Sequence, residues 1–166
     1  PMSIKKIVLI VLSYLIFSVA NAEDNLKSLG KFKDWESFVL LQDGNKTCFA
    51  QSIPVVRAPK KLKRDPSRLF VSFRPNEKIT DEISASPGYE FNINNSVTAT
   101  SGKKKIKFDI VQQGFAWIAD NKIEFRMIKR MKKGSRIMIT GYNQNGSQTI
   151  DHYSLLGFTK AYNATK

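Results

Sequence analysis

The chain contains 166 residues, and its 27 lysines and arginines outnumber 14 acidic residues, so the formal net charge is +13. One cysteine and one histidine exclude an internal disulfide framework and a Cys/His zinc site, and leave His152 as the only imidazole for a catalytic triad. The length predicts a single domain, and the charge favours an acidic partner.

The N-terminus has the pattern of a secretory signal peptide. The basic pair Lys5-Lys6 precedes an apolar run at 7–19, and Ala20-Asn21-Ala22 supplies the small residues of a cleavage site. The apolar run is shorter than the roughly 20 residues that span a bilayer, although an uncleaved anchor or a buried helix is the alternative. We expect cleavage after Ala22, which lowers the net charge to +11, and a periplasmic or secreted location. Export argues against nucleic acid as the partner.

The remaining chain begins with a polar stretch and a hairpin. Residues 23–33 are rich in lysine and are expected to be a flexible lead-in to a single domain at 34–166. Two apolar runs, 38–41 and 47–50, flank Gln42-Asp43-Gly44-Asn45, and Asp-Gly in this position predicts a tight turn. Residues 57–67 combine prolines with basic residues, which predicts a loop.

Apolar patterning predicts further strands in the middle of the chain. Residues 69–73 form the strongest strand candidate, and residues 81–83 follow a turn. Apolar and polar residues alternate over 89–93, which predicts a half-buried strand with Tyr89, Phe91 and Ile93 on one face. The same alternation recurs over 105–110, where Ile106, Phe108 and Ile110 are the apolar members.

One later segment has the period of a helix. Four apolar residues between 123 and 131 recur at helical spacing, with Asp120 or Asn121 as the N-cap and Gly134 just past the end. This pattern predicts an amphipathic helix at 122–133. Two strands, 137–140 and 149–155, follow it, with Asn145-Gly146 in the turn between them. We therefore expect an all-β antiparallel domain, a sandwich or a barrel, with one helix.

Short motifs spread over most of this domain resemble those of a known family. They are Asp34-Trp35, Cys48-Phe49-Ala50-Gln51-Ser52, Arg74-Pro75, Ile83-Ser84 with Gly88-Tyr89, Ala116-Trp117, Met131-Lys132-Lys133-Gly134, Gly141 with Gly146, and 151–158 with Ala161. In this order, behind a signal peptide, the chain resembles the invasion-associated locus B family of exported alphaproteobacterial proteins. The resemblance implies a small periplasmic or surface-exposed β domain with no established catalytic activity, and an association with host-cell invasion in some pathogenic members.

Two chemically reactive residues each have two interpretations. Some members of the family carry a second cysteine near the first strand, but residues 37–41 contain none, so Cys48 is unpaired within the chain. Cys48 is then either a reactive thiol or, as we favour, a buried small hydrophobe. His152 follows Asp151, but neighbouring strand residues point to opposite faces, which argues against a proton relay. We expect no catalytic residue, no metal site and no cofactor.

The large aromatic residues also have two interpretations. Trp35, Phe73, Tyr89 and Trp117 could form a platform on which sugar rings stack. In a small β domain such residues more often fill the core, and we favour that interpretation.

The positive charge is concentrated in three segments, 57–68, 103–107 and 122–136, which together carry +15. They are either separate solvated surfaces or one converging patch. If they converge, the partner is an anionic lipid, the phosphates of lipopolysaccharide or an acidic protein surface, with peripheral membrane contact at most. The candidate binding residues are Lys60, Lys61, Lys63, Arg64, Lys103, Lys104, Lys105, Arg126, Lys129, Arg130 and Lys133.

These observations favour a non-enzymatic interaction protein of the cell envelope or surface, monomeric or weakly associated. The alternative is a periplasmic chaperone-like or inhibitor-like module that binds proteins through a strand edge or an apolar groove. An enzyme is the third option, and it would need a cleft that contains His152.

Overall fold

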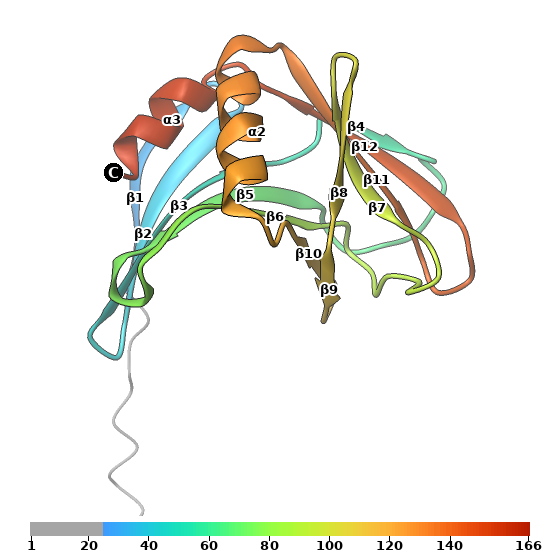
Figure 1. Ribbon diagram of the computed structural model, residues 1–166, viewed down its shortest axis with the longest axis horizontal. Helices are drawn as coiled ribbons and strands as arrows, with labels where there is room; N and C mark the ends of the chain where they lie inside the picture. The colour runs from blue at the N-terminus through green and yellow to red at the C-terminus, as the bar shows by residue number, and fades with distance from the viewer. Residues whose placement is uncertain (1–24) are drawn as a thin grey trace, which may run out of the picture.

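The computed structural model describes residues 25–166, which form two antiparallel sheets and two short helices (Figure 1). Both sheets are open, so of the two predicted architectures the chain adopts the sandwich-like one. The expected signal peptide, residues 1–22, lies outside the described residues. Neither helix within 25–166 is long and apolar enough to span a membrane.

Each sheet combines strands that are not all consecutive in the chain. In spatial order, the seven-stranded sheet consists of β1 (Asn25–Phe32), β2 (Trp35–Gln42), β3 (Asn45–Ser52), β5 (Arg68–Arg74), β6 (Ile79–Ser86), β10 (Phe115–Trp117) and β9 (Ile110–Gln112). The five-stranded sheet consists, in the same sense, of β4 (Val56–Ala58), β12 (Gln148–Ser154), β11 (Arg136–Tyr142), β7 (Val97–Ser101) and β8 (Lys104–Phe108). The helices are α2 (Asn121–Lys133) and α3 (Phe158–Ala164), and a 3₁₀ turn at Pro75–Glu77 joins β5 to β6.

The predicted hairpin at 38–50 is confirmed and is longer than expected. Its strands β2 and β3 pair from Trp35 opposite Ser52 to Gln42 opposite Asn45. Asp43 and Gly44 form the two-residue turn with φ values of 49° and 76°. Positive φ at both positions is the conformation that Asp-Gly favours, because its twist matches that of the flanking strands.

The lead-in expected at 23–33 is ordered over residues 25–32, so this prediction is wrong. These residues form β1, which pairs along β2 with one irregularity between Ser28 and Gly30. Most of β1 is solvent-exposed. It pairs with β2 through backbone hydrogen bonds, which residues with polar side chains can make as well as apolar residues, because the side chains take no part in them. Lys27 and Lys31 are typical of an edge strand, where charge discourages further pairing.

The core lies on one face of the seven-stranded sheet, which we call its inner face. Both helices lie on this side (Figure 1). Trp35 is 1% exposed, its indole packs against Phe158 of α3 at 4.9 Å between ring centroids, and its Nε1 donates to the carbonyl oxygen of Ser154 at 2.9 Å. The Ser37 hydroxyl donates to the carbonyl oxygen of Ala161 at 2.6 Å. One aromatic residue of β2 therefore links the sheet, α3 and β12.

Helix α3 was not predicted from the sequence, because its seven residues are too few to show a helical repeat of apolar positions. It begins after Gly157, whose φ is 88°. A Cβ at this position would collide with the carbonyl oxygen of Phe32. Glycine is therefore required both by the backbone conformation and by the close approach of β1.

Helix α2 confirms the predicted helix at 122–133. The Asp120 carboxylate accepts from the backbone N–H of Lys122 at 2.8 Å and caps the N-terminus. Met127, Ile128 and Met131 are buried. Gly134 ends the helix but has a φ of −84°, so the left-handed conformation usual after a helix is absent there. Close packing explains this glycine instead, since Leu155 Cδ1 would lie 3.2 Å from a Cβ.

The strand predicted at 89–93 does not form. Phe91 makes an isolated bridge to Asn143, and Ile93 is 87% exposed. The side chain of Asn92 accepts from the backbone N–H of Asn94 at 3.0 Å, a local turn that competes with strand pairing. The second alternation holds at Ile106 and Phe108, which are buried. It ends before Ile110, which is 46% exposed, because the chain passes from one sheet to the other after β8.

Candidate functional site

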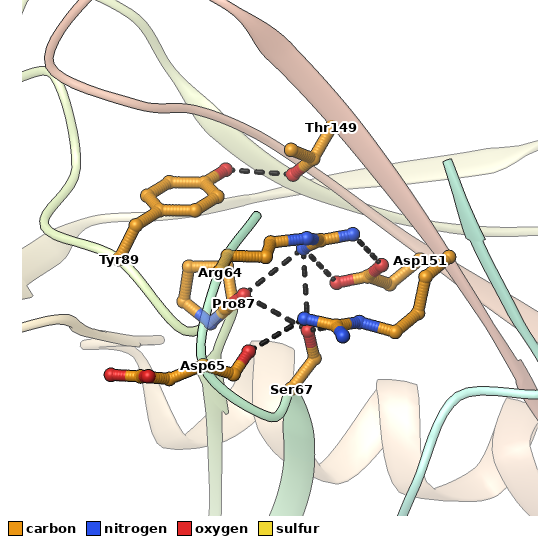
Figure 2. Close-up of polar contacts among 8 residues, drawn as sticks. Arg64, Asp65, Ser67, Pro87, Tyr89, Thr149 and Asp151 are labelled. Atoms are coloured by element: carbon orange, nitrogen blue, oxygen red, sulfur yellow. Dashed lines mark hydrogen bonds and ion pairs between the residues drawn. The ribbon is translucent and has the colours of Figure 1, made fainter. Parts of the chain in front are cut away.

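One predicted binding residue, Arg64, is held inside the protein. Its side chain is 2% exposed, and its guanidinium donates to both carboxylate oxygens of Asp151, at 2.5 and 2.9 Å (Figure 2). The same group donates to the carbonyl oxygen of Pro87 at 3.0 Å and to the Ser67 hydroxyl at 3.2 Å. Arg64 is therefore a structural residue and does not belong to the candidate binding surface.

A second arginine and a tyrosine, both half-buried, extend the contacts around Arg64 into a cluster. Arg57 donates from Nε to the Ser67 hydroxyl at 3.2 Å and from Nη2 to the carbonyl oxygen of Asp65 at 2.6 Å. The hydroxyls of Tyr89 and Thr149 share a hydrogen bond of 2.7 Å (Figure 2). Burial raises the pKa of the Tyr89 phenol, while the bond to Thr149 opposes the shift. The cluster fastens the loop 59–67 to β12.

The basic helix and the lysine-rich hairpin meet at one groove, which we call the basic groove. Its volume is about 570 Å³. It lies between α2, the turn of the β7–β8 hairpin and the start of β11, and Figure 1 shows the hairpin standing beside α2. The lining residues are Ser101, Gly102, Arg126, Lys129, Arg130, Lys133, Gly134, Ser135 and Arg136.

A second hollow of about 350 Å³ continues the basic groove along β8. Arg126 and Arg130 line both, so the two form one surface. The second hollow adds Lys104, Lys105 and Lys107, together with one acidic residue, Asp109. The helix and the hairpin, two of the three basic segments, therefore share a face.

The third basic segment does not reach this face. Lys60, Lys61 and Lys63 lie on the loop 59–67, and none of them lines the basic groove or the second hollow. Lys103 is exposed at the hairpin turn beside Gly102. The structure thus separates the three loop lysines from the predicted cations of α2 and of the β7–β8 hairpin.

The cations of the basic groove have no acidic partners. These five residues, the groove cations, are Arg126, Lys129, Arg130, Lys133 and Arg136. Within residues 25–166 the ion pairs are made by Arg64 and Arg74 alone. Five positive charges that make no ion pair, gathered around one concavity, raise the local concentration of anions. Guanidinium groups additionally match the oxygens of phosphate or carboxylate in pairs.

Arg136 and the two serines of the basic groove were missed as candidates from the sequence. Arg136 belongs to the basic segment 122–136, but it stands beyond the helix end, in a strand. Ser101 and Ser135 carry no signal of their own. The turn after Gly134 places Ser135 and Arg136 at the groove, and the pairing of β7 with β11 brings Ser101 beside them.

A buried carboxyl anchors the helix that presents these cations. Glu124 of α2 is 3% exposed, and its Oε2 accepts from the backbone N–H of Ile83 in β6 at 2.6 Å. Burial raises the pKa of Glu124 to about 7, against the effect of the Ile83 bond, and the nearby Glu82 and Asp81 add to the rise. We therefore expect the packing of α2 on the sheet to depend on pH.

The residues suspected of reactivity are placed mostly in the core. Cys48 is 5% exposed, which agrees with the buried interpretation. Asp151 turns inward to Arg64, and His152, on the opposite face of β12, has an Nδ1 with no hydrogen-bond partner. Trp35 and Phe73 are buried in the core, and Tyr89 packs against it. Trp117 is half-buried and does not belong to the core, so the core interpretation is wrong for this residue. In the part of the chain that the structure describes, no group of three or more His, Cys, Asp or Glu side chains could hold a metal ion.

The fold and the basic groove define a small two-sheet β domain with a cationic surface. The family model for the invasion associated locus B (IalB) protein matches residues 35–166, and the chain belongs to this family. No curated protein and no solved structure matches the chain. The matched region contains α2, the β7–β8 hairpin and the buried Arg64 cluster, and only β1 among the described elements precedes it.

Proposed function

We propose that this protein is an exported, non-enzymatic binding protein of the periplasm or cell surface. The basic groove takes a polyanionic, phosphate-bearing component of the envelope, an anionic lipid headgroup or a lipopolysaccharide phosphate. The signal-peptide pattern at residues 1–22, which ends before the family domain begins, supports export. The convergence of two basic segments on one groove, without acidic partners, supports the anionic ligand.

The size of the groove and its charge fit a ligand with more than one phosphate. A volume of about 570 Å³ falls in the range of small-molecule sites, about 300–1,000 Å³. Basic residues contribute about 1 kcal/mol each near an anionic membrane, so the groove cations together suffice for peripheral binding. The Ser135 hydroxyl at the rim offers a hydrogen bond to an oxyanion.

Vesicle sedimentation tests this function. The variant R126Q/K129Q/R130Q removes three groove cations, and its matched control, K60Q/K61Q/K63Q, removes three lysines from the loop 59–67. We expect the wild type and the control to sediment with phosphatidylglycerol-containing vesicles at low salt, and the groove variant to lose at least tenfold in binding. Binding of the wild type should weaken steeply with added salt.

Two results would contradict the proposal. Equal losses in both variants would show that binding follows net charge and not the groove. Unchanged sedimentation of the groove variant would remove the lipid as a ligand of this site. Soluble inorganic polyphosphate serves as a competitor. It should displace the protein from the vesicles completely if the groove recognises phosphate alone, and only in part if binding also requires the membrane.

A further inference from the structure

An unbroken row of aromatic rings crosses the outer face of the seven-stranded sheet, the face opposite the core. Its five members, the aromatic row, are Phe38 of β2, Phe49 of β3, Phe70 of β5, and Phe115 and Trp117 of β10. Ring centroids along the row are 5.3, 6.0, 6.2 and 5.6 Å apart. The rings therefore touch one another from strand to strand.

The small residues of β6 keep the row continuous. Ser84 lies opposite Phe70 on one side and opposite Trp117 on the other. It is 5% exposed, although it belongs to the outer face, because the aromatic rings cover it. Phe70 and Phe115 thus meet at 6.2 Å across an intervening strand.

No described element covers this face. Within residues 25–166 both helices lie on the inner side of the sheet, as Figure 1 shows. The five rings are half-buried, and each packs against its neighbour in the row. A solvent-facing antiparallel sheet normally carries polar residues on its open side. A contiguous apolar stripe there marks an interaction surface.

The outer face is nearly neutral on a strongly basic protein. The cross-strand register places five ionisable residues on it: Lys31, Glu36, Arg68, Arg74 and Glu82. Arg74 forms an ion pair with Glu82 at 2.8 Å. Much of the positive charge of residues 25–166 therefore lies elsewhere, notably on α2, whose lysines and arginines are exposed to solvent.

We propose that the outer face of the seven-stranded sheet is a two-fold interface between two copies of this chain. The charge distribution favours this occupant, because back-to-back pairing buries the neutral face and leaves both basic grooves on opposite outer surfaces. Taken over all residues of the seven strands, a strand spacing of about 4.8 Å and a rise of about 3.3 Å per residue give the face an area of roughly 700 Å². Specific interfaces bury about 600–1,000 Å² per partner.

Symmetry supports the same occupant. A two-fold axis places the same patch on both subunits, so the patch must complement itself. A row of rings that already pack edge-on and face-on against their own kind meets this condition. Aromatic residues at the centre and ion pairs at the rim are the usual arrangement of such interfaces.

Molar mass as a function of concentration tests the proposal. The double variant F49T/F70T replaces two central rings with a residue suited to strands. Its matched control, F125Q, removes an aromatic residue that is 51% exposed on α2, away from this face. By sedimentation velocity we expect dimers of the wild type and of F125Q at about 100 µM, well above a micromolar dissociation constant, and monomers of the double variant.

Tryptophan emission supplies a measurement that needs no variant. Trp35 is buried at every concentration, so any change reports Trp117 at the end of the aromatic row. Emission of the wild type should shift to the blue as dimers form. A wild type that stays monomeric would overturn the proposal. A wild-type dimer would also overturn it if its tryptophan emission stayed constant with concentration and if the F49T/F70T variant had the same molar mass. In the monomeric case the row belongs to a different partner, such as an apolar polypeptide segment.

Discussion

Replacing Arg64 should lower the free energy of unfolding by a large amount without weakening the binding of anions. The variant R64M keeps most of the side-chain volume and removes the charge. It leaves the Asp151 carboxylate, 2% exposed, without its bidentate partner, and it leaves the Pro87 carbonyl oxygen without its donor. Removing one member of a buried ion pair costs about 3–5 kcal/mol. Domains are stable by about 5–15 kcal/mol, so this is a large share.

The double variant R64M/D151L separates the pair from its surroundings. It removes both charges, so it should cost clearly less than the sum of R64M and D151L alone. Urea unfolding at 25 °C, followed by circular dichroism, gives the four free energies of the cycle. The loop variant K60Q serves as the control, and it should stay within about 0.5 kcal/mol of the wild type.

A cost of less than about 1 kcal/mol for R64M would refute this prediction, because a buried carboxylate would then be tolerated without its partner. Folded R64M that loses vesicle binding as strongly as R126Q/K129Q/R130Q would refute it as well. That result would show that Arg64 takes part in binding, whereas its burial and its contacts with Asp151 predict that it does not.

Two further perturbations follow from single residues. The pKa of Glu124 is raised to about 7, so the folded state holds a proton that the unfolded state releases above about pH 4.5, and stability should fall by about 1–3 kcal/mol as pH rises from 4.5 to 7. E124Q should flatten that slope in urea titrations, and an unchanged slope would assign it to other groups. G157A should cost about 2–3 kcal/mol, because its φ is positive and a Cβ meets the Phe32 carbonyl. G146A, with positive φ but open space, should cost about 1 kcal/mol; equal melting temperatures for the two would rule out a steric cause.

Short sequence patterns predicted correctly those elements whose formation depends on residues close to one another in the chain. Asp43-Gly44 sets its own hairpin, and the spacing of Met127, Ile128 and Met131 sets the buried face of α2. Predictions failed where pairing or packing with distant residues decides the outcome. Residues 25–32 become a strand because β2 offers them an open edge. Ile93 stays in solvent because no strand pairs with the segment around it.

The candidate site divides in the same way. The sequence alone determined that the charge is positive and concentrated in three segments, and that one Cys and one His limit the available chemistry. It could not distinguish Arg64 from Lys63, because the partner that buries Arg64 lies 87 residues away in β12.

Only the tertiary structure decided which charges act together. The sequence determined the class of fold, the helix with its basic face and the signal-peptide pattern, because these follow from composition and short-range periodicity. The pairing of β7 with β11 brings the hairpin to the end of α2 and creates the basic groove. The order of strands β2, β3, β5, β6 and β10 lines up five aromatic rings from segments far apart in the chain. Both surfaces depend on long-range register, which is set by the packing of the whole core and not by any local pattern.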